Sequence, residues 1–182
     1  QASRVAKGRP LVNLIQLDSE ERITSLLNVE SFDAAGFVFM ATMKGVVKKT
    51  PLEDFRLPRK NGKRAIKLDA KDELVGTKIT DGKQHIMLIS DAGKAVYFDE
   101  KDSRPLGRDT RGVKGIELED EQNVISLMVP GSEDEILTVS ENGFGKKSRI
   151  TDFRKTKRGA KGVIAMQLSE RNGKLISAVQ VL

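Results

Sequence analysis

The sequence has no cysteine and no tryptophan, a single histidine and a single tyrosine, and aromatic residues make up 4% of its 182 residues. Without cysteine, the chain can form no disulfide, thiolate zinc site or cysteine nucleophile. His85 is the only histidine, so no second imidazole is present to complete a histidine metal site. The scarcity of aromatic rings also leaves few platforms on which single-stranded bases could stack.

Long apolar runs are also missing. None approaches the roughly 20 residues that a membrane-spanning helix needs, and the first apolar stretch is too short for a signal peptide. We therefore expect a cytoplasmic protein with no membrane partner. The sequence begins at Gln1 and ends within an apolar run at Leu182, which suggests a piece of a longer chain.

Positive charge is in modest excess. The 32 lysine and arginine residues outnumber the 26 acidic residues, which gives a net charge of +6. An excess of this sign favours a polyanionic partner. The hydrophobic content of 38% is sufficient for one globular domain, or for several small repeats that share a core.

The chain contains an internal repeat with a period of about 50 residues. Three features recur: a leucine next to polar residues, an apolar residue a few positions later, and a glycine at a hairpin turn. Their positions are Leu17, Leu68, Leu118 and Leu168; Ile23, Leu74, Val124 and Leu175; and Gly45, Gly93 and Gly143. The predicted units are 4–55, 56–103, 104–153 and a partial unit, 154–182.

Each unit has the same order: a basic loop that contains glycine, an apolar strand, an acidic turn, a short strand, the glycine hairpin and a return strand. The strands before the hairpins read FVFMA, IMLIS and ILTVS, which are typical of β-strands buried on both faces. Four strands in about 50 residues predict an all-β, propeller-like stack of blades. The expected core between blades comprises Phe37, Phe39, Met87, Ile89, Leu137 and Val139.

The basic residues gather in the repeated loops, whereas the acidic residues gather in turns elsewhere. Because each loop occupies the same place in its unit, we expect the loops to form one continuous basic edge. A second basic position follows the hairpins of the first and third units. The candidate DNA-binding residues are Arg4, Lys7, Arg9, Lys48, Lys49, Arg59, Lys60, Lys63, Arg64, Arg108, Arg111, Lys114, Lys146, Lys147, Arg149, Lys155, Lys157, Arg158 and Lys161.

Glycine-containing basic loops suit the phosphates of duplex DNA, because backbone N–H groups and cationic side chains can approach an anion together. No recognition helix or zinc module is visible, so we expect no readout of base edges. A curved basic edge would instead bind DNA by bending it. We therefore expect double-stranded DNA as the partner.

No catalytic motif of the Walker, HExxH or GxSxG type is present. Tyr97 lies in the apolar segment 95–98, which favours a core position over a role as a strand-cleaving nucleophile. His85 follows a polar turn and is expected at the surface. We therefore expect no catalytic residue, metal site or cofactor in this chain.

The sequence resembles the C-terminal domain of the DNA gyrase A protein over essentially its whole length. The stretches that carry the resemblance are SRVAKGRPLVNLIQLDSEERITSLLNV, VFMATMKGVVKKTPLEDF, DTRGVKGIELEDEQNVISLMVP, ENGFGKKSRITDF and TKRGAKGVIAMQLSERNGKLISAVQV. The resemblance implies a β-pinwheel, a propeller-like disc whose blades exchange strands. It also implies that duplex DNA wraps around the basic rim, which serves ATP-dependent negative supercoiling by a type II topoisomerase.

The resemblance further implies an A2B2 assembly with the gyrase B protein and the rest of the gyrase A protein, in the bacterial cytoplasm at the nucleoid, with ATP and Mg²⁺ used elsewhere in the enzyme. The sequence departs from the family in two respects. It supplies an incomplete disc, and it lacks the gyrase-box heptapeptide QRRGGKG. The alternatives are the equivalent domain of topoisomerase IV and a protein-interaction propeller, and basic rather than apolar loop tips disfavour the latter.

Overall fold

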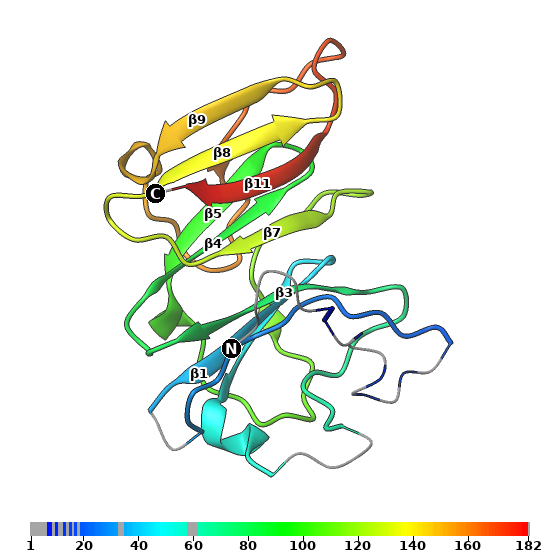
Figure 1. Cartoon of the computed structure of the whole chain (residues 1–182). Coiled ribbons are helices and arrows are strands. Elements are labelled where there is room, and N and C mark those ends of the chain that lie inside the picture. The colour runs from blue at the N-terminus through cyan, green and yellow to red at the C-terminus, as the bar shows by residue number, and fades with distance from the viewer. Residues whose placement is uncertain are drawn as a thin grey trace.

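The computed structural model describes residues 7–8, 10, 13, 15, 17, 19–32, 35–57 and 62–181. These residues form three antiparallel sheets stacked face to face (Figure 1). The first sheet has the order β3 (Leu74–Thr80), β1 (Phe37–Thr42), β2 (Val46–Pro51), β6 (Val113–Lys114). The second has the order β10 (Val163–Ile164), β5 (Lys94–Asp99), β4 (His85–Ser90), β7 (Val124–Met128). The third has the order β11 (Leu175–Val181), β8 (Glu135–Ser140), β9 (Gly145–Arg149).

Short 3-10 helices follow the return strands. They are η2 (Leu52–Phe55), η3 (Glu100–Asp102) and η4 (Ile150–Asp152). No α-helix is present among the described residues. The predicted all-β, propeller-like fold is confirmed.

The predicted hairpins form at the three recurring glycines. Gly45, Gly93 and Gly143 have φ angles of 81°, 74° and 80°, in the left-handed region where a side chain is disfavoured. Each glycine joins two paired strands, as in the register that sets Phe39 opposite Lys49 and Met87 opposite Tyr97. The period in the sequence therefore corresponds to a repeated turn in the structure.

The first two sheets are each completed by a strand from farther along the chain. β6 pairs with Val46 and Val47, and β10 pairs with Lys94 and Ala95. The predicted units 4–55, 56–103 and 104–153 therefore do not coincide with the sheets. The period fixes the length of the repeat, but the residue at which the chain passes from one sheet to the next depends on pairing between distant segments.

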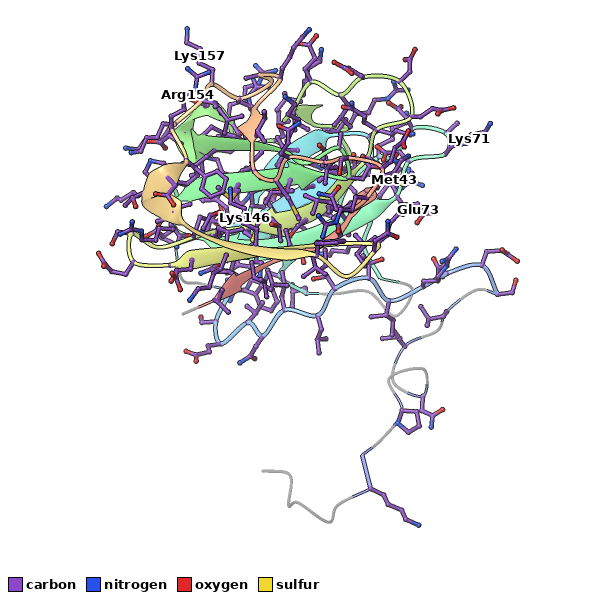
Figure 2. The ribbon with its side chains drawn as sticks, turned by 90° about the horizontal axis from the view of Figure 1, so that it is seen from above. Met43, Lys71, Glu73, Lys146, Arg154 and Lys157 are labelled. Carbon is purple, nitrogen blue, oxygen red and sulfur yellow. The ribbon has the colours of Figure 1, made fainter. Side chains whose placement is uncertain are left out.

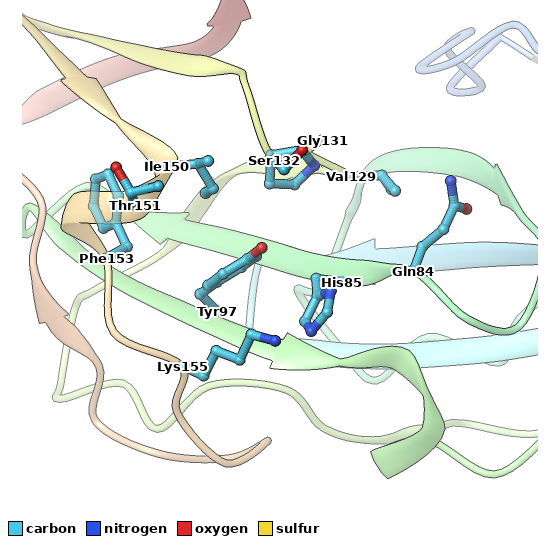
Figure 3. A pocket seen from close by; sticks show the side chains of 11 residues that line it. Gln84, His85, Tyr97, Val129, Gly131, Ser132, Ile150, Thr151, Phe153 and Lys155 are labelled. Atoms are coloured by element: carbon cyan, nitrogen blue, oxygen red, sulfur yellow. The ribbon is translucent and has the colours of Figure 1, made fainter.

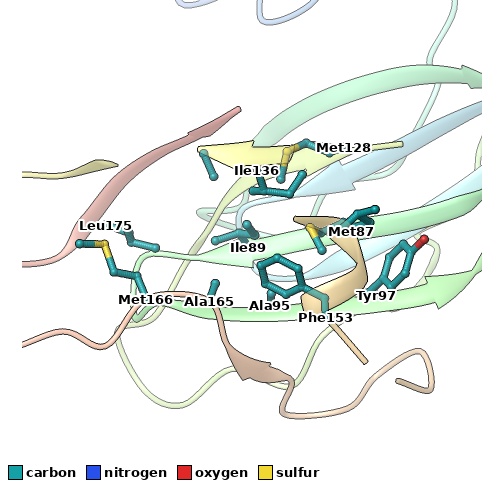
Figure 4. Packing of buried hydrophobic residues seen from close by; sticks show 12 residues of the cluster. Met87, Ile89, Ala95, Tyr97, Met128, Ile136, Phe153, Ala165, Met166 and Leu175 are labelled. Carbon is teal, nitrogen blue, oxygen red and sulfur yellow. The ribbon is translucent and has the colours of Figure 1, made fainter. Parts of the chain in front are cut away.

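The core lies between the sheets. The second sheet is buried on both faces: Ile86 and Leu88 pack toward the first sheet, and Met87 and Ile89 pack toward the third. Figure 4 shows the second of these layers, in which Met87 and Ile89 lie close to Ile136. Burying such side chains stabilises the fold by about 1.5–3 kcal/mol each.

The expected core residues divide into two groups. Phe39, Met87 and Ile89 are fully buried, as predicted. Phe37, Leu137 and Val139 are only half-buried. The burial of β8 alternates along the strand because Ile136, and not Leu137 or Val139, faces the second sheet. Within the described residues, the third sheet packs against another sheet on one face.

Candidate nucleic-acid interface

Two basic segments run along equivalent edges of consecutive sheets. Segment 104–114 follows the outer edge of β2, where the N–H of Leu106 donates to the carbonyl of Lys49 at 2.8 Å. Segment 154–164 follows the outer edge of β5, where the N–H of Thr156 donates to the carbonyl of Tyr97 at 2.7 Å. The two segments therefore lie on the same side of the stack.

Successive basic loops are also hydrogen-bonded to one another. The N–H of Lys67 donates to the carbonyl of Thr110 at 2.9 Å. One repeat later, the N–H of Glu117 donates to the carbonyl of Ala160 at 3.0 Å. Three loops from three repeats are thus joined in one continuous band.

We call the basic residues of this band the basic belt. Its described members, all exposed or half-buried, are Lys63, Arg64, Lys67, Arg104, Arg108, Arg111, Lys114, Arg154, Lys155, Lys157, Arg158 and Lys161. Figure 2 shows Arg154 and Lys157 projecting from one edge of the molecule, whereas Lys71 and Glu73 lie at the opposite edge.

Several belt side chains bridge neighbouring loops. Arg64 pairs with Asp109 at 3.3 Å, and Arg111 pairs with Asp69 at 3.1 Å. Both pairs are solvent-exposed, and such pairs contribute about 0–1 kcal/mol, so the arginines can exchange these carboxylates for phosphates at little cost. Arg158 donates from Nε to the carbonyl of Asp102 at 2.9 Å, which anchors it across the loops.

The other candidates in the basic loops of the first two repeats differ from one another in exposure. Lys63 is half-buried and donates to the carbonyl of Asp54 at 3.4 Å, so it also holds its own loop. Lys7 is exposed. Four candidates lie outside the described residues: Arg4, Arg9, Arg59 and Lys60.

Three candidates lie on β9 in the third sheet: Lys146, Lys147 and Arg149, all exposed. Lys147 pairs with Glu135 on the adjacent strand at 2.6 Å. Lys146 donates to the carbonyl of Ala165 at 3.3 Å. Among the described residues no segment runs along the outer edge of β9, which leaves this strand open to solvent.

Lys48 and Lys49 were expected at the surface, but both are buried, with exposed fractions of 0% and 4%. Lys49 points into the junction between the first and second sheets and pairs with buried Glu100 at 3.7 Å. Lys48 points to the other face of its strand. Segment 104–114 covers β2 on its outer edge, so these two lysines are not available to a ligand in solution.

The Lys48 ammonium holds two belt loops together. It donates to the carbonyl of Ala65 at 2.7 Å, to the carbonyl of Thr110 at 3.3 Å, and to the carbonyl of Arg108. Burial lowers the pKa of Lys48 from 10.5 to about 8, and the charge of Arg108 also lowers it, whereas Asp109 and Asp54 raise it. Lys48 therefore positions the loops that carry the belt.

This lowered pKa gives a testable dependence of stability on pH. Between pH 8 and pH 10.5 the unfolded chain keeps a proton on Lys48 that the folded chain has lost, so this group makes the folded state more stable as pH rises. We expect the free energy of unfolding of wild type, relative to that of Lys48→Met, to rise in this pH range by at most about 1.4 kcal/mol per pH unit. Urea denaturation at pH 7.5, 8.5 and 9.5 measures it. Parallel pH profiles for the two proteins would contradict the role given to this amine.

Three belt residues are not among the candidates predicted from the sequence: Arg104, Arg154 and Lys67. The side chain of Lys67 is exposed, and its backbone joins the loops of two repeats. Each basic loop contains a glycine with a positive φ angle: Gly62, Gly112 or Gly162. These three glycines are spaced 50 residues apart. That spacing places Lys67 in the same loop and was the signal available in the sequence.

The described residues also bear on metal binding and on membrane insertion. The described part of the chain holds no cluster of three or more histidine, cysteine or acidic residues that could bind a metal ion. It also holds no helix of sufficient length and hydrophobicity to span a bilayer.

Stacked antiparallel sheets that exchange strands along a 50-residue repeat define a β-propeller type of repeat domain, here with a basic edge. A family described as the DNA gyrase C-terminal domain, a beta-propeller, matches residues 36–81, 84–130 and 134–181. Each range contains one of the three hairpin glycines, Gly45, Gly93 and Gly143. The chain belongs to the family of DNA gyrase C-terminal domains.

Individual relatives agree with this membership. The DNA gyrase A proteins of Klebsiella oxytoca and of Escherichia coli K12 are each 46% identical over 181 residues, which cover 100% of this chain and 21% of each relative. The chain therefore spans about a fifth of the length of the curated relatives that it matches.

Two solved structures are similar in fold. The C-terminal domain of DNA topoisomerase IV matches with a TM-score of 0.89 and 27% identity, over 96% of this chain and 55% of that chain. The DNA gyrase A C-terminal domain matches with a TM-score of 0.84 and 26% identity, over 97% of this chain and 59% of that chain.

Proposed function

We propose that this chain binds duplex DNA along the basic belt, without sequence specificity, and bends the DNA around the stack of sheets. The continuity of the belt carries the proposal: hydrogen bonds from Lys67 to Thr110 and from Glu117 to Ala160 join the basic loops of three repeats. A duplex can therefore meet cations from successive sheets along one path.

The chemistry of the belt favours phosphate contacts over readout of bases. Its cations extend from loops, and no α-helix that could enter the major groove is present among the described residues. Arginine and lysine in this setting neutralise phosphates and fix the path of the duplex. Bending a site of 20–30 base pairs by 40–90° costs about 1–6 kcal/mol, which several phosphate contacts can offset at low salt.

We place this activity in a gyrase. In this proposal the chain is the DNA-wrapping part of the gyrase A protein. It acts with the rest of that protein and with the gyrase B protein, in an A2B2 assembly, during ATP-dependent negative supercoiling. ATP and Mg²⁺ would bind in other parts of the enzyme, and no catalytic residue is assigned to this chain. The location would be the bacterial cytoplasm, at the nucleoid. The similarity to curated gyrase A proteins supports the assignment.

A second candidate is the equivalent domain of topoisomerase IV, favoured by the TM-score of 0.89 to such a domain. Both candidates share the binding of duplex DNA. Supercoiling assays with the intact enzyme distinguish them, because only the gyrase role requires the introduction of negative supercoils.

A gel-shift series at increasing salt tests the belt directly. We expect Lys155→Gln, Lys157→Gln and Lys161→Gln, made together, to weaken binding to all sequences alike. Because each phosphate contact contributes about 0.9 to the slope of log K against log salt, losing three should reduce its magnitude by about 2.7. Binding of wild type should tighten as the duplex lengthens.

The matched control removes three exposed lysines outside the belt: Lys71, Lys78 and Lys174. Their replacement by glutamine changes the net charge equally and should leave the salt slope nearly unchanged. Equal losses in the two triple variants would mean that net charge, rather than the belt, drives binding. A sequence-selective loss would indicate readout of bases.

A further inference from the structure

A cavity of about 570 Å³ lies at the junction between the second and third sheets. Its apolar wall includes Tyr97, Ile150 and Phe153, which belong to the core cluster between these sheets. His85 lies beside Tyr97, with their ring centroids 5.2 Å apart. Figure 3 shows these side chains around the hollow, with Lys155 near His85 and Tyr97. His85, expected in a surface turn, is thus half-buried at the start of β4.

The corresponding place at the first junction is occupied by the protein itself. Tyr97 and Ile150 occupy the positions that Lys49 and Glu100 occupy one repeat earlier, as strand register and helix starts show. There, Lys49 and Glu100 form their buried ion pair, and Lys49 also lies 5.0 Å from the centre of the Phe37 ring. At the second junction the equivalent side chains are apolar, and a space remains between the sheets.

The lining of the cavity indicates what it can bind. Three rings, from His85, Tyr97 and Phe153, provide flat surfaces for an aromatic group. None of the lining residues is acidic, and Lys155 supplies a positive charge. Lys155 forms no ion pair within the described part of the chain, so its ammonium can bind an anion.

We propose that this cavity is a binding site for small planar aromatic carboxylates. The ring of the ligand packs against Tyr97, Phe153 and His85, and its carboxylate binds the Lys155 ammonium. The cavity volume and its combination of mostly apolar walls with a few polar groups match those of ligand sites in general. Burial raises the pKa of Tyr97, so its hydroxyl stays protonated near neutral pH and can donate a hydrogen bond.

The chain provides its own reporters for the test. His85 is the only histidine and Tyr97 the only tyrosine, so their ring signals in an NMR spectrum belong to this cavity without further assignment. We expect naphthalene-2-carboxylate to shift both sets of signals in a saturable manner. Naphthalene-2-methanol, which has the same rings without the charge, should bind up to about fivefold more weakly, because the contact with the exposed Lys155 ammonium is lost.

Two lysine variants distinguish binding in the cavity from nonspecific attraction of the anionic ligand to the positive charge of the protein. Lys155→Gln should weaken binding of naphthalene-2-carboxylate by up to about fivefold and leave binding of the alcohol unchanged. Lys157→Gln is the matched control, because Lys157 is exposed but does not line the cavity. A third variant, Ser132→Phe, places a ring at the lining position of Ser132 and should abolish binding of both compounds.

Three results would overturn the proposal. The first is the absence of a saturable shift in wild type, and the second is equal binding by wild type and Lys155→Gln. The third is a shift of the His85 and Tyr97 signals by a 12-base-pair duplex but not by naphthalene-2-carboxylate, which would assign the cavity to the DNA interface instead. Failure of ligand binding with intact DNA binding would leave the role of the belt unaffected.

Discussion

Replacing Glu100 with alanine is expected to lower the free energy of unfolding by about 3–5 kcal/mol, because breaking a buried ion pair leaves an uncompensated charge inside the protein. Glu100 is fully buried and accepts hydrogen bonds from the Thr80 hydroxyl at 3.0 Å and the Gln84 N–H at 3.1 Å. Its carboxylate also pairs with Lys49. Alanine would leave all three donors without this acceptor between the first and second sheets.

Urea denaturation of wild type and three variants measures the effect. Glu133→Ala, which removes an exposed carboxylate from an acidic turn, is the matched control and should change stability by less than about 0.5 kcal/mol. The double variant Lys49→Tyr, Glu100→Ile places at the first junction the residue types that stand at the equivalent positions of the second junction. It should recover much of the lost stability, since replacing both members of a buried pair by apolar residues is often neutral. A loss for Glu100→Ala no larger than that of the control would refute the role of this pair.

The repeat and its strands could be predicted because they depend on local sequence. The glycines at Gly45, Gly93 and Gly143 fix tight turns, and the apolar runs before them form strands wherever the chain places them. The basic edge followed from the same period, since equivalent residues in a repeat occupy equivalent places. The sequence could therefore predict the fold class and the gathering of basic loops along one edge.

The burial of Lys48 and Lys49 could not be predicted in the same way. Lys146 and Lys147 follow their hairpin in the same pattern, yet they are exposed. The difference arises from segment 104–114, which runs along β2, and from Glu100, which lies far away in the sequence. Whether a lysine is a surface charge or a buried donor thus depends on distant partners that the local pattern does not contain.

A glycine immediately precedes each strand, β6 or β10, that completes the sheet of the preceding repeat. Replacing such a glycine gives the second large expected effect. Gly162 precedes β10 with a φ angle of 83°, and a Cβ added there would lie 2.5 Å from the carbonyl oxygen of Ala95 on β5. Gly162→Ala should therefore lower stability by about 2–5 kcal/mol, as the sum of about 1–2 kcal/mol for a left-handed backbone and about 1–3 kcal/mol for overpacking.

Gly143→Ala isolates the backbone contribution. Gly143 has a φ angle of 80°, but an added Cβ would meet no atom within 4 Å, so only the backbone penalty of about 1–2 kcal/mol applies. Thermal or urea unfolding of both variants gives the difference. Because β10 ends the loop that carries Lys155, Lys157 and Lys161, Gly162→Ala should also weaken DNA binding under conditions where the domain remains folded, whereas Gly143→Ala should not. Equal stability losses in the two variants would show that close contact with β5 does not hold the exchanged strand in place.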